Sequence, residues 1–365
     1  MRKLPLDCLR PGMEVARPIY SAEGRVLLNK GVILKPYYIR RLRELGVPAV
    51  YVVDELVGEW EVQDVVGETT RLEAVKLVKE VMEASRRNRS AGNGLIASPG
   101  VSRVVENILD DLLRQREIMV NLVDIRAIDD YTFGHSVNVC ILALITGITL
   151  GYRRPSLIQL GMGALFHDIG KTLIPFQILN KPGPLTPEEY QLVCHHCRYG
   201  FDILAGQENI APEVAMVALE HHERYDGTGY PQGLRGEEIH EFAAITGIVD
   251  VYDALTADRV YRRAYLPHEA YEMLAGAGNF RHDYRLVRAF LFNIAAYPSG
   301  TLVQLNTGEI GVVLSTPRGQ SYRPRVRLLY NKDGGILKDK PEVDLSAEPQ
   351  RWVSRVIPPG EKVGD

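Results

Sequence analysis

Apolar residues follow two different periods along this chain. Near both ends they form short runs separated by glycine, a pattern typical of strands joined by turns. Residues 1–58 contain such a run at 49–53, and a short helix is predicted over 36–45. Residues 297–365 show the same pattern, for example at 325–330. We therefore predict a small β-rich module at each end of the chain.

Between these modules, apolar residues recur at helical spacing. Residues 59–120 are predicted as a helical linker region, with apolar stripes in 70–89 and 101–112. Such stripes usually pack within their own chain, and a homodimer through these N-terminal helices is the alternative. Residues 121–296 are predicted to form one mostly helical domain. Its most apolar stretch, 137–150, reads as a buried helix that is too short and too polar to span a membrane.

The composition fits a globular protein. Of 365 residues, 45% are hydrophobic and 24% are charged, with a net charge of −3. This balance argues against binding a nucleic acid polymer, but it permits a local basic pocket for a phosphate ligand. The N-terminus lacks the apolar region of a secretory signal, and the four cysteines suggest no disulfide framework. A cytoplasmic location is therefore expected.

Ionisable side chains occupy positions where the helical pattern requires apolar ones. In 155–171, Asp168 falls on the apolar face beside His167, and Gly170 is predicted to end the helix. Buried ionisable groups are costly unless they are paired or bound to metal. A buried ion pair between Asp168 and Lys171 is the alternative explanation.

A second apolar stripe, in 211–222, ends on His221 and His222. The turn at 226–229 follows at once, and its glycines allow a sharp change of direction or a close approach to a ligand. A pair of hydrogen-bonded core histidines is the alternative.

In a third segment, Asp250 and Asp253 are three residues apart on an otherwise apolar helix, and Arg259 and Arg262 follow. Carboxylates facing inward with guanidinium groups beside them suit a metal centre with a phosphate clamp. An internal network of salt bridges would give the same pattern.

Two more histidines face inward. His196 lies on the inner face of a helix that a capping box starts at Thr186, whereas His195 lies on a different face. His135 opens the apolar helix, where a satisfied core histidine is the alternative. Zinc bound by Cys194 and Cys197 is disfavoured, because no second cysteine pair accompanies them.

Taken together, so many inward histidines and aspartates on one helical domain favour a metal centre over separate structural explanations. Imidazole and carboxylate ligands suit iron, manganese or zinc better than magnesium or calcium. A dinuclear centre can lower the pKa of a bound water to about 7 and clamp both oxygens in a phosphodiester displacement.

Four strings in these segments resemble the HD-GYP family, a branch of the HD phosphohydrolase superfamily. In order they are YTFGHSVNV, HDIGK, HHERYDGTGYP and VDVYDALTADRVYR. The resemblance covers about residues 121–290 and implies an all-helical phosphohydrolase domain flanked by the two β-rich modules, so the fold class is mainly α. It also implies hydrolysis of the bacterial second messenger cyclic di-GMP to linear pGpG, with further cleavage to GMP as an option.

The resemblance also implies roles for particular residues. Asp168 would bridge the metals and, with Lys171, act in catalysis. Lys171, Tyr230, Arg259 and Arg262 would bind the substrate. The metal ligands would be His135, His167, Asp168, His196, His221, His222 and Asp250.

Two departures from the family pattern bear on these roles. The family has His-Pro-x-x-Gly where this chain has His196-Cys-Arg-Tyr-Gly200, so the ligand is kept and the loop differs. Members with three metals carry a glutamate where this chain has Tyr131. We therefore expect two divalent ions, iron or manganese, rather than three.

Three other functions remain open from the sequence. The same chemistry could act on another nucleotide, such as cyclic GMP-AMP or a guanosine alarmone. A catalytically weak protein could instead sense cyclic di-GMP, although the filled ligand positions count against this. Some HD-type diiron proteins are oxygenases, which oxygen dependence would reveal.

Overall fold

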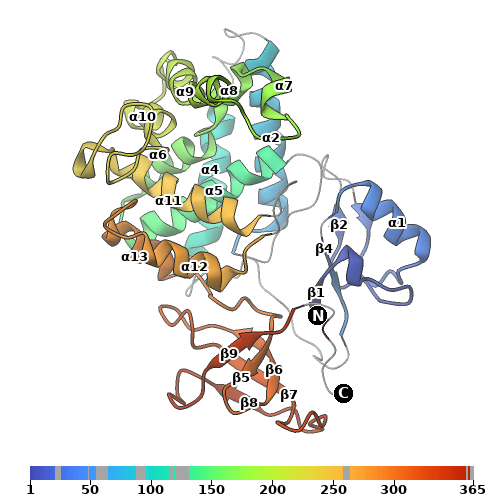
Figure 1. Cartoon of the computed structure of the whole chain (residues 1–365). Helices are drawn as coiled ribbons and strands as arrows, with labels where there is room; N and C mark the ends of the chain where they lie inside the picture. Colours follow the sequence, from blue (N-terminus) through green and yellow to red (C-terminus); the bar gives the residue numbers. More distant parts are fainter. Residues whose placement is uncertain are drawn as a thin grey trace.

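Three groups of elements follow one another along the chain in this computed structural model (Figure 1). The structure describes residues 1–20, 26–47, 49–54, 65–87, 96, 98–115, 119–120, 131–257, 264–358 and 361. Among these residues, no helix is both long enough and apolar enough to cross a bilayer.

The N-terminal group consists of short strands around one helix. Its elements are β1 (Arg2–Pro5), the 3-10 turn η1 (Leu6–Cys8), β2 (Ile19–Tyr20), β3 (Val26–Leu28), α1 (Pro36–Glu44) and β4 (Ala49–Val52). β1 pairs with β4 and β2 with β3, both antiparallel. A small separate core lies between them, with Leu4, Leu34 and Leu42 among its members.

The central group is helical. Its elements are α2 (Glu68–Arg87), α4 (Pro99–Arg114), α5 (Tyr131–Thr149), α6 (Arg154–Leu165), η2 (Ile169–Leu173), α7 (Phe176–Leu179), α8 (Pro187–Cys194), α9 (His196–Ala205), α10 (Pro212–Glu220), η3 (Gly236–Glu238), α11 (Glu241–Thr256), α12 (Pro267–Gly276) and α13 (Tyr284–Leu291). One hydrophobic core unites α2, α4, α5, α6, α10, α11 and α13. A mainly helical domain flanked by small β-rich modules, as predicted, is confirmed.

The apolar faces of α2 and α4 belong to that same core. Val78 and Val81 of α2, with Ile108 and Leu109 of α4, are fully buried against the other helices. The segment predicted as a linker is thus packed into the helical body. These faces are already covered within the chain, and the homodimer stays an untested prediction.

The C-terminal group forms a five-stranded antiparallel sheet in the order β8-β7-β6-β5-β9. Its strands are β5 (Leu302–Leu305), β6 (Ile310–Ser315), β7 (Arg325–Tyr330), β8 (Glu342–Asp344) and β9 (Val353–Val356). The module is joined to the helical body at Ser321, whose hydroxyl donates to the carbonyl of Leu291 at 3.2 Å.

Candidate metal centre

His167 and Asp168 lie in a turn rather than on a helix. α6 ends at Leu165, and η2 begins at Ile169. The helix predicted to continue to Gly170 is therefore shorter than expected. Helical spacing alone cannot show this end, because the apolar pattern continues through the turn. Adjacent side chains on an α-helix point in directions roughly 100° apart. Because His167 and Asp168 lie in a turn, their side chains do not have to diverge in this way.

His221 and His222 also follow a helix end, since α10 stops at Glu220. The pair of His195 and His196 marks another break. α8 ends at Cys194 and α9 starts at His196, with the predicted capping box of Thr186 and Glu189 present. His196 is 1% exposed, whereas His195 is exposed, as the sequence indicated.

Glycines allow the ligand-bearing segments to approach closely. A Cβ atom at Gly170 would collide with the carbonyl oxygen of His196. At Gly247 on α11, a Cβ atom would lie 2.5 Å from the carbonyl oxygen of His221. Any larger residue would push η2 from α9 or α11 from α10, so these glycines set the width of the site.

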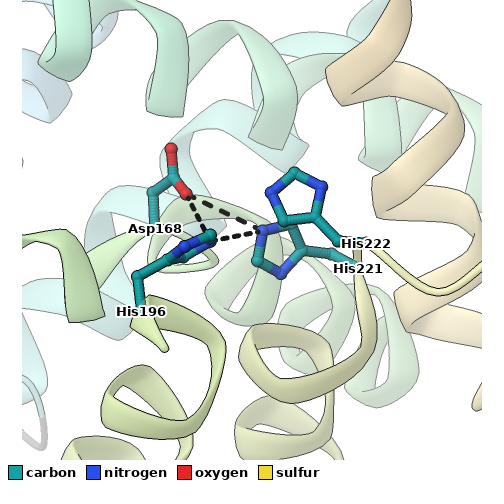
Figure 2. Close-up of side chains that lie close together, drawn as sticks. All are labelled: Asp168, His196, His221 and His222. Atoms are coloured by element: carbon teal, nitrogen blue, oxygen red, sulfur yellow. Dashed lines mark hydrogen bonds and ion pairs between the residues drawn. The ribbon is translucent and has the colours of Figure 1, made fainter. Parts of the chain in front are cut away.

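The first of two clusters consists of Asp168, His196, His221 and His222 (Figure 2). The Nε2 atoms of His196 and His221 are 3.4 Å apart. They lie 3.4 Å and 3.7 Å, respectively, from Oδ1 of Asp168. Ligand atoms about 2.0–2.2 Å from one ion are separated by roughly such distances, so one divalent ion fits between them.

The second cluster consists of His135, His167 and Asp250. Oδ1 of Asp250 is 3.0 Å from Nε2 of His135 and 4.0 Å from Nε2 of His167. The other carboxylate oxygen of Asp168, Oδ2, lies 3.5 Å from Nε2 of His167. The two oxygens of Asp168 therefore face different clusters, and all seven predicted ligands lie together.

The backbone fixes the orientation of three histidine rings. Nδ1 of His167 is 2.8 Å from the carbonyl of Ala164, and Nδ1 of His196 is 2.6 Å from that of Val193. Nδ1 of His221 is 3.1 Å from the carbonyl of Val217. A carbonyl only accepts, so each Nδ1 carries the proton and each Nε2 presents a lone pair, as a metal ligand requires.

Burial keeps the rings of His167, His196 and His222 neutral. It lowers the pKa of His167 to about 4 and that of His196 to about 3, and it holds the pKa of His222 well below its usual value. Burial acts to raise the pKa of Asp168, but Lys171 and the neighbouring histidines hold it well below the usual range. Neutral imidazoles around a carboxylate are the protonation states that bind a cation.

Two buried atoms support this interpretation directly. Within the part of the chain that the structure describes, Nε2 of His167 and Oδ1 of Asp168 have no hydrogen-bond partner. Leaving buried polar atoms unpaired costs about 1–3 kcal/mol each. A bound cation would satisfy both, so the residues present fit a metal centre.

Of the four residues predicted to bind the substrate, the structure describes Lys171 and Tyr230. Nζ of Lys171 lies 2.5 Å from Oδ2 of Asp168, and its side chain is 32% exposed. The ring of Tyr230 is 4.8 Å from that of His222, centroid to centroid. Arg259 and Arg262 lie outside the described residues, as do Asp129 and Asp130 near the position of a third-metal ligand.

Two buried carboxylates near the site are absent from the predicted ligand set. Asp253 is fully buried, and its Oδ2 lies 2.7 Å from Nδ1 of His135. Burial acts to lower the pKa of His135, but the hydrogen bonds to Asp250 and Asp253 raise it well above its usual value. The three-residue spacing of Asp250 and Asp253 was the only signal for this pair.

Glu223 is the other missed carboxylate. It is buried, and it accepts hydrogen bonds from the backbone amides of Gln232, Gly233 and Leu234 at 2.6, 3.1 and 3.0 Å. It thereby anchors the loop that follows Tyr230. Nothing in the sequence pattern distinguished it from a surface glutamate.

The fold and the two clusters define a helical protein with a buried histidine and aspartate site able to bind metal. The profile of the HD domain family matches residues 105–286, and that of a KOW domain associated with HD domains matches 302–362. The chain belongs to the HD domain family, so the family prediction is confirmed.

Several characterised proteins are similar. A cyclic di-GMP phosphodiesterase of Pseudomonas aeruginosa is 38% identical over 244 residues, 67% of this chain and 59% of that protein. A cyclic di-GMP phosphodiesterase response regulator of Xanthomonas campestris is 38% identical over 182 residues, 49% of this chain and 48% of that protein. A 3′3′-cGAMP-specific phosphodiesterase of Vibrio cholerae is 32% identical over 255 residues, 67% and 54% of the two chains. The chain spans about half to three-fifths of the length of these relatives.

Proposed function

We propose that this protein is a metal-dependent phosphodiesterase that hydrolyses cyclic di-GMP. The observation that carries the proposal is the pair of adjoining clusters with one carboxylate, Asp168, facing both. Relatives that share two thirds of the chain are named for cyclic dinucleotide hydrolysis, which supports the same substrate class.

Some residues of the chain would bind metal, and others would bind the substrate. The three histidines of the first cluster would hold one divalent ion together with Asp168, and the three residues of the second cluster would hold the other. The chemistry that bound divalent ions supply at such a site is activation of a water and neutralisation of phosphate charge. Lys171 is paired with Asp168 and partly exposed. Its ammonium group donates a hydrogen bond to a phosphate oxygen of the substrate. We propose that Tyr230 also binds the substrate, as do Arg259 and Arg262, which lie outside the described residues.

Hydrolysis adds water across one phosphodiester of the ring. The water oxygen bonds to phosphorus and the bond to the 3′ oxygen breaks, which releases linear pGpG. We propose two metal ions because the seven ligands fall into two groups, and pGpG as the product because it results from cleavage of one phosphodiester. Iron or manganese is the proposed metal, since nitrogen donors accompany carboxylates in both groups.

The test is to purify the protein anaerobically, measure its metal, and follow cyclic di-GMP by chromatography. We expect about two ions per chain and formation of pGpG. The variant with both His167→Ala and Asp168→Ala should form none. Bound metal without turnover of cyclic di-GMP would reject this substrate, and absence of metal under reducing conditions would reject the mechanism.

A 3′3′-cGAMP-specific relative of comparable coverage makes that dinucleotide the second candidate substrate. The two bases of cyclic di-GMP are guanines, whereas one base of cyclic GMP-AMP is adenine. The ratio of kcat/KM for the two dinucleotides, measured side by side, decides between them.

A further inference from the structure

A line of hydrogen bonds leads from helix α2 to the metal centre. Nη1 of Arg71, on α2, donates to Oδ1 of Asn138 at 2.8 Å. Nδ2 of Asn138 donates to Oδ1 of Asp253 at 3.2 Å. Oδ2 of Asp253 is the partner of Nδ1 of His135 at 2.7 Å. Three helices, α2, α5 and α11, thus contribute to the position of one predicted ligand.

The polarity of this line follows from the donors and acceptors available. Arginine only donates, so Arg71 attracts the oxygen end of the Asn138 amide. The amide nitrogen is then directed at Asp253, which as a carboxylate only accepts. If the amide turned by 180°, two oxygens would face each other at Asp253. Arg71 therefore selects the one orientation of Asn138 that supports Asp253.

Asp253 in turn fixes the ring of His135. The carboxylate is fully buried, so its charge depends on the donors that reach it. With Nδ1 of His135 held by Asp253, Nε2 points to Asp250, 3.0 Å away in the second cluster. Partners of this kind typically contribute about 10–100-fold to metal affinity.

Helix α2 lies outside the part of the chain that matches the HD domain family, residues 105–286. It packs against α5, which carries His135, and against η2, which carries Lys171. The residues of α2 that contact the site therefore lie in a segment that the family match does not include.

We propose that Arg71 is a positioning residue of the metal centre, acting on His135 through Asn138 and Asp253. This inference rests on the proposed metal site and extends that site to α2. It assigns to the helix between the N-terminal module and the HD domain an effect on the second cluster that two intervening side chains transmit.

The test is a titration of metal-free protein with Mn²⁺, following free Mn²⁺ by electron paramagnetic resonance without any nucleotide. We expect Arg71→Ala to weaken one of two sites by about 10–100-fold and to spare the other. Arg71→Lys, which keeps a donor, should recover part of the affinity. Arg87→Ala is the control on the same helix, because Arg87 is exposed and forms an ion pair with Glu83, one turn away on that helix.

Two further variants separate positioning from general damage to the fold. Asn138→Asp keeps the shape and an acceptor for Arg71 but removes the donor to Asp253, so it should weaken the same site. In a His135→Ala background, Arg71→Ala should cause no additional loss. An additional loss there, or equal weakening of both sites, would overturn the positioning role.

The outcomes also separate this inference from the proposed function. If the wild-type protein binds two Mn²⁺ ions and Arg71→Ala binds them equally well, Arg71 has no positioning role and the metal centre stands. If the wild-type protein binds no metal, the proposed function and this inference fail together.

Discussion

At the scale of single residues, the burial of a side chain and the direction in which its ligand atom points distinguish a candidate ligand from a neighbour of the same type. His195 and His196 are adjacent, and Nδ1 of each is bonded to a backbone carbonyl. Only His196 is buried with Nε2 directed at Asp168 and His221. His195 is exposed at the break between α8 and α9.

This pair provides a matched prediction. We expect His196→Ala to lower metal affinity by about 100-fold or more, because it removes a ligand outright. His195→Ala should leave metal content and turnover of cyclic di-GMP unchanged. Metal analysis after gel filtration, together with the rate of pGpG formation, checks both variants. Equal effects of the two substitutions would contradict the assignment of His196.

At the scale of elements, the site depends on how closely short segments approach one another. η2 contacts α9 through Gly170, and α11 contacts α10 through Gly247. Helix ends matter as much, because α6, α8 and α10 stop beside the histidines that they position. The geometry of the two clusters is therefore a property of junctions between elements rather than of any one helix.

The second prediction concerns such a junction. Gly170→Ala should destabilise the fold by about 1–3 kcal/mol, since the new methyl group collides with the backbone of His196. Gly276→Ala, where the added atom meets nothing within 4 Å, should be close to neutral. Urea unfolding of both variants provides the comparison. A Gly170→Ala protein as stable as the wild type would show that the segments can move apart freely.

At the scale of the whole molecule, the candidate ligands come from segments that only the folded chain brings together. His135 lies on α5, His196 on α9 and Asp250 on α11. A metal ion that binds these groups binds the native state and not the unfolded chain. Its binding energy then adds to the stability of the fold.

The third prediction follows from this linkage. Free Mn²⁺ at 100 times its dissociation constant should raise the free energy of unfolding by about 2.7 kcal/mol for each site. We therefore expect the Tm to fall on addition of EDTA and to recover with excess Mn²⁺. Asp168→Asn, which lacks the carboxylate between the clusters, should show a much smaller difference. Equal Tm values of the wild-type protein with and without chelator would argue against a metal centre.

The sequence by itself determined what local spacing controls. Apolar periodicity located the two β-rich modules and the central helices, and it singled out inward ionisable residues. The resemblance to a family then implied which seven of them are ligands, and that metal-binding role stays a prediction. These features depend on residues within one or two helical turns of each other, so they can be predicted from the amino-acid sequence. The segment of Arg259 and Arg262 lies outside the described residues, and their roles stay predictions as well.

Only the tertiary structure decided how those residues are grouped. The division into two clusters, the position of Asp168 between them and the partnership of His135 with Asp253 depend on contacts across long stretches of chain, 118 residues in the last case. The same holds for α2, whose stripe could have faced another molecule but lies in the common core. Helix crossings and close approaches at glycine fix these contacts, and periodicity within a single segment carries no information about them.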